Sequence, residues 1–154
     1  MGEETLASTT NNAMMANELN TLIRLNFDAI EAYTSAIERL ENADYRQTLE
    51  EFRADHIRHV DELKELVHWM GAAPAKTGDA MQILTRGKVA LGNLRGDKGI
   101  LQAMKSNEDN TNAVYEKEIG KLRYSQDMAD VLKHHLDDER RHRAWLVRTL
   151  ETLA

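Results

Sequence analysis

The chain has 154 residues, a net charge of −6 and no cysteine. This length fits one domain with a sizeable core, and without cysteine there are no disulfides, iron–sulfur clusters or thiolate zinc sites. No apolar run reaches the ~18 residues of a membrane span, and the first residues do not resemble a signal peptide. Charges of both signs are interspersed, which argues against a nucleic-acid surface. We therefore expect a cytoplasmic protein with no nucleic-acid or membrane partner.

The composition predicts an all-α fold. Pro74 is the one proline, and 5% of the residues are aromatic. Alanine, leucine, glutamate, lysine and arginine are plentiful, and these residues favour helices.

Residues 1–10 are polar and predict a flexible N-terminus, so that a single domain covers residues 11–154. A first helix is expected from residue 11 to about Leu40. Its apolar seam, which contains the polar Asn26, consists of Leu19, Leu22, Ile23, Ile30, Tyr33, Ile37 and Leu40. A second apolar face, made of Leu25, Ala29, Ala32 and Ala36, predicts a homodimer.

A second helix is expected after a short turn. Asp44, followed three residues later by Gln47, resembles a capping box. The helix would run to about Met70 and end at Gly71, because glycine favours the conformation that stops a helix. Its seam consists of Leu49, Phe52, His56, His59, Leu63, Leu66 and Met70.

A long connection follows, from Gly71 to about Lys98, and it holds five of the eight glycines. A short helix is expected within it at residues 80–91. A third helix from about Lys98 to Tyr124 and a fourth from about residue 128 to Thr152 complete the chain, with no internal repeat evident. The short connections make helices one and two, and helices three and four, antiparallel neighbours. The sequence thus predicts a four-helix bundle of two antiparallel hairpins joined by a long crossover.

Polar residues interrupt the apolar seam of every helix near its middle. Glu139 and His142 lie three residues apart on a face of the fourth helix that otherwise carries leucines, and Glu108 lies on the seam of the third. A buried carboxylate is costly unless it is paired or binds a metal. The predicted metal ligands are His56, His59, Glu108, Glu139 and His142, and the further candidates for ligands or for groups that orient ligands are Asn26, His135 and Tyr115.

Each of these residues also has a structural interpretation. A single core histidine is most often only hydrogen-bonded, a solvent-facing position is an equal alternative for Glu108, and Tyr33 and Tyr115 are most simply core aromatics. His68 and His134 are off the seams and are expected at the surface. The arginines of the fourth helix are expected to form a solvated face; they are Arg140, Arg141, Arg143 and Arg148. The expected convergence of all these polar residues at one level of the bundle favours a metal site.

Four segments resemble the metal-binding helices of the bacterioferritin and rubrerythrin group of the ferritin-like superfamily. They are Asp138-Glu139-x-x-His142-x-x-Trp145-Leu146, Ala54–Val60 with its His59, Glu108 followed by Tyr115, and Leu25–Ile30 leading to Tyr33. The resemblance covers about residues 15–150 and is closest to small uncharacterised ferritin-like domains. It implies a di-iron carboxylate bundle that binds Fe(II) and reacts with dioxygen or peroxide.

Two positions depart from that pattern, because Asn26 and His56 stand where the family has glutamate. Of four carboxylates only Glu108 and Glu139 remain, and two carboxylates neutralise one divalent ion. One metal is therefore expected, or two with an added bridge such as hydroxide or oxide. The chain also stops with its fourth helix, so a storage cage is not expected.

The sequence leaves two functions open. The first is an iron-binding, ferroxidase-like oxidoreductase with a mononuclear or dinuclear site, for which zinc or manganese are alternative metals. The second is a non-catalytic helical stress or interaction protein whose site is vestigial or holds structural zinc. The oxidation of added Fe(II) in air separates the two.

Overall fold

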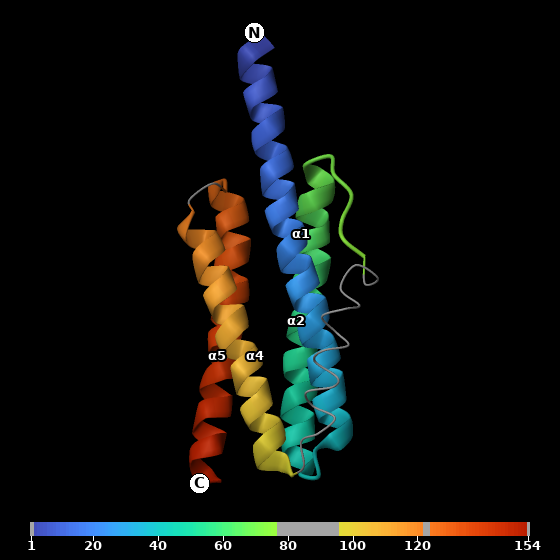
Figure 1. The fold of residues 1–154 in the computed structure, drawn as a ribbon, viewed down its shortest axis with the longest axis vertical. Helices are drawn as coiled ribbons and strands as arrows, with labels where there is room; N and C mark the ends of the chain where they lie inside the picture. The colour runs from blue at the N-terminus through green and yellow to red at the C-terminus, as the bar shows by residue number, and fades with distance from the viewer. Residues whose placement is uncertain (1, 77–95, 122–123, 154) are drawn as a thin grey trace.

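The computed structural model describes residues 2–76, 96–121 and 124–153, and within these residues the chain forms four long helices (Figure 1). They are α1 (Gly2–Arg39), α2 (Ala43–Trp69), α4 (Asp97–Gly120) and α5 (Gln126–Thr152). The N-terminal part of α1 extends beyond the other helices (Figure 1). The helix begins nine residues earlier than expected, whereas the flexibility of residues 1–10 stays a prediction.

The four helices pair as two antiparallel hairpins, α1 with α2 and α4 with α5, and α1 also packs on α4 and α2 on α5. The end of α2 and the start of α4 lie at opposite ends of the bundle (Figure 1), as two hairpins joined by a long crossover require. The predicted four-helix bundle is confirmed. The short helix predicted at residues 80–91 lies outside the described residues.

Local signals at the helix ends explain where α2 begins and stops. Its N-cap is Asn42, whose Oδ1 accepts a 3.0 Å hydrogen bond from the Tyr45 amide. The predicted capping box at Asp44 is wrong, because Asp44 already lies in the first turn. At the other end Gly71 has a φ of 78°, a left-handed conformation that glycine adopts without strain.

The buried face of α1 matches the predicted one except at two positions. Ala29 and Ala36 are fully buried within the chain, whereas Ile30 and Ile37 are only partly buried. Small side chains face inward here because α1 packs closely against its neighbours. Two of the four residues proposed for a dimer face are thus already used inside the bundle, and the homodimer stays a prediction.

The core consists of two apolar clusters with a polar layer between them. One cluster contains Leu22, Leu63 and Leu132, and the other contains Leu49, Leu101 and Leu146. The layer between them is made of Asn26, His56, His59, Glu108, Thr111, Asn112, His135, Glu139 and His142, all buried. Burying so many polar groups is unfavourable unless each is paired, so the layer requires a specific network of contacts. Within the described residues, no helix combines the length and hydropathy needed to cross a lipid bilayer.

Candidate metal centre

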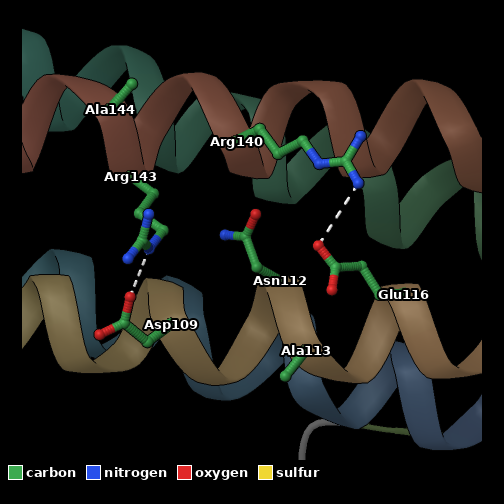
Figure 2. A pocket seen from close by; sticks show the side chains of 7 residues that line it. All are labelled: Asp109, Asn112, Ala113, Glu116, Arg140, Arg143 and Ala144. Atoms are coloured by element: carbon green, nitrogen blue, oxygen red, sulfur yellow. Dashed lines mark hydrogen bonds and ion pairs between the residues drawn. The ribbon is translucent and has the colours of Figure 1, made fainter.

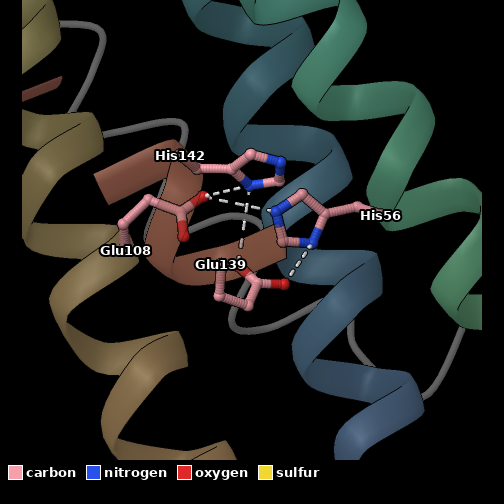
Figure 3. A group of neighbouring side chains, drawn as sticks. All are labelled: His56, Glu108, Glu139 and His142. Atoms are coloured by element: carbon pink, nitrogen blue, oxygen red, sulfur yellow. Dashed lines mark hydrogen bonds and ion pairs between the residues drawn. The ribbon is translucent and has the colours of Figure 1, made fainter. Parts of the chain in front are cut away.

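Four buried side chains from three helices converge in the middle of the bundle (Figure 3). Each can place one ligand atom so that all four atoms lie within 4.8 Å of one another. The residues are His56 of α2, Glu108 of α4, and Glu139 and His142 of α5, and none has any exposed surface. The helical spacing explains the α5 pair, because residues three apart share a face.

Glu108 lies at the centre of this group. Its Oε1 is 3.3 Å from His56 Nε2 and 3.3 Å from His142 Nδ1. The same carboxylate accepts hydrogen bonds from the hydroxyl of Tyr33 and, at 3.1 Å, from that of Thr111. The expectation that Glu108 is buried is therefore met, and the solvent-facing alternative is wrong.

Glu139 has an oxygen without a hydrogen-bond donor. Its Oε1 lies 3.3 Å from His59 Nδ1 and 3.4 Å from His56 Nδ1, but it accepts no hydrogen bond from any described residue. Burial alone would raise the pKa of Glu139, but the nearby imidazoles of His56, His142 and His59 outweigh burial and hold that pKa well below its usual range. A buried, ionised carboxylate with one oxygen that accepts no hydrogen bond is suited to bind a metal ion.

His59 is buried in the same layer but stands outside the group of four. Its Nε2 lies 2.8 Å from Asp138 Oδ2, and its Nδ1 lies 3.3 Å from Asn26 Oδ1 and 3.3 Å from Glu139 Oε1. Of the five predicted ligands, the structure therefore brings four to one point and places His59 next to Glu139 but outside this group.

The three additional candidates form a hydrogen-bonded chain beside the group. Asn26 Nδ2 donates to the Tyr115 hydroxyl at 2.8 Å, and that hydroxyl lies 3.1 Å from His135 Nδ1. His135 stacks on His59 with ring centroids 4.0 Å apart. Burial and the neighbouring His59 lower the pKa of His135 to about 2, so this imidazole is neutral.

Two aspartates that the sequence interpretation left out complete the histidine contacts. Asp55 of α2 accepts a 2.7 Å hydrogen bond from His142 Nε2 on α5, and Asp138 of α5 faces His59 on α2 in the same way. Burial favours the neutral carboxylic acid, but the hydrogen bonds from the facing histidine and Arg141 lower the pKa of both aspartates. Such carboxylates orient metal-binding imidazoles and raise their basicity.

Two arginines of the outer surface join this network. Arg141 of α5 binds Asp55 at 2.7 Å and Asp138 at 3.0 Å, and Arg58 of α2 binds both aspartates as well. Both guanidinium groups are about half exposed. The prediction that the α5 arginines are exposed to solvent is thus correct. It did not include the ion pairs that connect Arg141 to the candidate centre.

A signal for these residues exists in the sequence. The pattern Asp-x-x-Arg-His occurs at residues 55–59 and again at residues 138–142. The two copies face each other across α2 and α5, and each aspartate binds the histidine of the other copy. This shared five-residue pattern is the sequence signal that could have identified the two aspartates.

A separate hollow of about 480 Å³ lies between α4 and α5 (Figure 2). It is lined by the ion pairs of Arg143 with Asp109 and Arg140 with Glu116, and by Asn112. Asn112 Nδ2 donates to the main-chain oxygens of Glu108 at 2.7 Å and Glu139 at 3.2 Å. It thereby fixes the backbones of the two carboxylate residues from behind.

As predicted, His68 and His134 are exposed.

Comparison with known structures confirms the ferritin-like fold. The X-ray structure of Dps from Thermosynechococcus elongatus has a TM-score of 0.74 to this chain, with 18% sequence identity over 93% of this chain and 94% of that one. At this identity the likeness shows the fold alone. No curated protein matches the chain.

A family model described as "Domain of unknown function (DUF2383)" matches residues 14–121. The match includes Asn26, His56, His59 and Glu108, and it ends before α5, which carries Glu139 and His142. Because it covers more than half of the chain, this protein belongs to the DUF2383 family.

Proposed function

We propose that this protein binds a divalent transition metal, iron in the first place, at the centre of its bundle. The ligands are His56, Glu108, Glu139 and His142. The observation that carries the proposal is the convergence of one ligand atom from each of these four fully buried residues within 4.8 Å of the others.

The donor set fits such an ion. Two imidazoles and two carboxylates suit iron, zinc, manganese or copper, and ligand type alone does not choose among them. Bound as Fe(II), the metal would supply one-electron chemistry towards dioxygen or peroxide. The protein's own groups hold the ligands in place: Tyr33 and Thr111 donate hydrogen bonds to Glu108, and Asp55 orients His142.

The charge of the site favours one metal ion per chain. Glu108 and Glu139 are the two fully buried carboxylates of the layer, and together they balance one divalent cation. A second ion would leave buried positive charge without compensation, which is costly in a low-dielectric interior. A dinuclear site would therefore need an additional anion such as hydroxide.

The proposal is tested by loading the metal-free protein with Fe(II) under anaerobic conditions and counting iron per chain by elemental analysis. We expect one tightly held iron. Glu139→Gln and His142→Gln should lose it, because each removes a ligand. The matched controls on the same helix are Glu151→Gln and His134→Gln, whose side chains are exposed. Equal iron binding by all four variants would contradict the proposal.

A structural zinc site in a non-catalytic interaction protein is the second candidate. Its support is the number and kind of donors, since structural zinc is four-coordinate and both histidine nitrogens and carboxylate oxygens can bind it. Near-ultraviolet absorbance after admission of air to the Fe(II)-loaded protein separates the two candidates. Rapid oxidation supports redox chemistry, whereas no change, together with zinc in the purified protein, supports the structural role.

A further inference from the structure

The amide of Asn26 is held in one orientation. Its Nδ2 donates to the main-chain oxygen of Leu22 at 2.9 Å and lies 2.8 Å from the Tyr115 hydroxyl. A flipped amide would place two carbonyl oxygens against each other at the Leu22 contact, which is unfavourable because neither can donate. The Asn26 oxygen Oδ1 therefore faces the histidines of α2.

This orientation determines which nitrogen of His56 carries a proton. Asn26 Oδ1 lies 2.8 Å from His56 Nδ1, and an amide oxygen can only accept a hydrogen bond. His56 Nδ1 is therefore the donor. The nitrogen left to bind a metal is Nε2, which lies 3.3 Å from Glu108 Oε1.

Two other histidines of the layer, His142 and His59, are arranged in the opposite way. His142 Nε2 donates to Asp55 at 2.7 Å, and His59 Nε2 donates to Asp138 at 2.8 Å, so each presents Nδ1 to the interior. His56 Nε2 and His142 Nδ1 meet at Glu108 Oε1, at 3.3 Å each. His59 Nδ1 instead faces the side where His56 presents its N–H.

We propose that Asn26 is a positioning residue that fixes the tautomer of His56, so that a metal binds His56 through Nε2 on the Glu108 side and not on the His59 side. The inference rests on the proposed metal site. It adds which nitrogen of His56 binds the metal and on which side of His56 the metal lies. On the His59 side, where Glu139 Oε1 lies 3.3 Å from His59 Nδ1, a cation would also meet the Nδ1–H of His56, which repels it. The neutral amide of Asn26 also contributes no negative charge there, unlike the glutamate expected at this position from the family resemblance.

The test is nuclear magnetic resonance of the full chain with ¹⁵N-labelled histidine, metal-free and loaded with zinc, which is diamagnetic. Long-range correlations between the carbon-bound protons of the imidazole ring and its two nitrogens show which nitrogen carries a proton and which binds the metal. We expect His56 to keep its Nδ1–H in both states and to bind zinc through Nε2, with His142 binding through Nδ1. Zinc on His56 Nδ1, or on both nitrogens, would overturn the inference.

Variants separate positioning from a merely structural role. Asn26→Leu removes the acceptor, so His56 should lose its fixed Nδ1–H and zinc affinity should fall about 10- to 100-fold. Asn26→Asp keeps an acceptor oxygen and should keep the Nδ1–H. The matched control is Asn20→Leu, which removes an α1 amide bonded to Ala73 and Ala75 and should leave the His56 signals unchanged. An unchanged His56 tautomer in Asn26→Leu would contradict the inference.

The outcomes for this inference and for the proposed function differ. If the wild-type chain binds no zinc or iron, the proposed function fails. If it binds zinc but through the other nitrogen of His56, the metal site stands and the role of Asn26 fails. The wild-type spectra decide the second question even if Asn26→Leu does not fold.

Discussion

His142 Nε2 and Asp55 Oδ2 form a 2.7 Å hydrogen bond that joins α5 to α2 and leaves His142 Nδ1 facing Glu108. One contact thus connects the two hairpins of the bundle and sets the direction of a candidate ligand. Asp138 and His59 repeat the arrangement in the reverse direction. The geometry of the centre therefore depends on Asp55 and Asp138, which are not among its four candidate ligands.

Replacing Asp55 by asparagine should weaken metal binding about 10- to 100-fold, because the carboxylate that orients His142 and raises its basicity is lost. Affinity would be measured by zinc competition with a chelator of known strength. Asp137→Asn is the matched control, since Asp137 is exposed on α5 next to Asp138. Equal affinities for Asp55→Asn and wild type would show that the hydrogen bond has no part in metal binding.

Metal affinity should rise with pH. Burial alone would lower the pKa of His142, but hydrogen bonds with Asp55, Glu108 and Glu139 outweigh burial and raise that pKa to about 11 in the metal-free protein. A metal must displace this proton, so below that pH each unit of increase should strengthen binding by about tenfold for one displaced proton. A pH indicator in weakly buffered solution would detect the released proton. Affinity that is constant between neutral and mildly alkaline pH would contradict this.

Restoring two carboxylates should increase the number of bound metal ions. The double variant Asn26→Asp with His56→Glu brings the layer to four carboxylates, which balance two divalent cations. Iron per chain, counted after anaerobic loading, should therefore rise from one to two. The control is Asn20→Asp with His68→Glu, which adds the same two carboxylates at positions outside the layer. A count that stays at one would mean that charge is not what limits occupancy.

The apolar clusters on either side of the polar layer should carry the stability of the bundle. Leu146→Ala, at a fully buried position next to the layer, should lower the free energy of unfolding by about 2–5 kcal/mol, because it removes buried methyl groups and leaves a cavity. Urea unfolding followed by circular dichroism would measure this. Met14→Ala, at an exposed position, should change stability little. A loss at position 146 no larger than that at position 14 would argue against this packing.

Much of the fold follows from local sequence signals. Helical periodicity identified all four helices, and the glycine at position 71 marked the end of α2. The same periodicity placed Glu108, Glu139 and His142 on inward faces, and all three are fully buried. For α1 it was right at five of seven apolar positions. Ile30 and Ile37 are only partly buried, and Ala29 and Ala36 are buried in their place, because a hydrophobic pattern gives more weight to large residues than to closely packed small ones.

The sequence alone determined that this protein is a helical bundle with imidazole and carboxylate groups on its inward faces, because the 3.6-residue repeat fixes which side chains share a face of one helix. Only the tertiary structure decided that four of the five expected ligands meet at one point and that His59 stands apart. It also decided that Asp55 and Asp138 bind histidines of the opposite helix. The relative rotation and axial shift of packed helices set such contacts, and no pattern within a single helix specifies them.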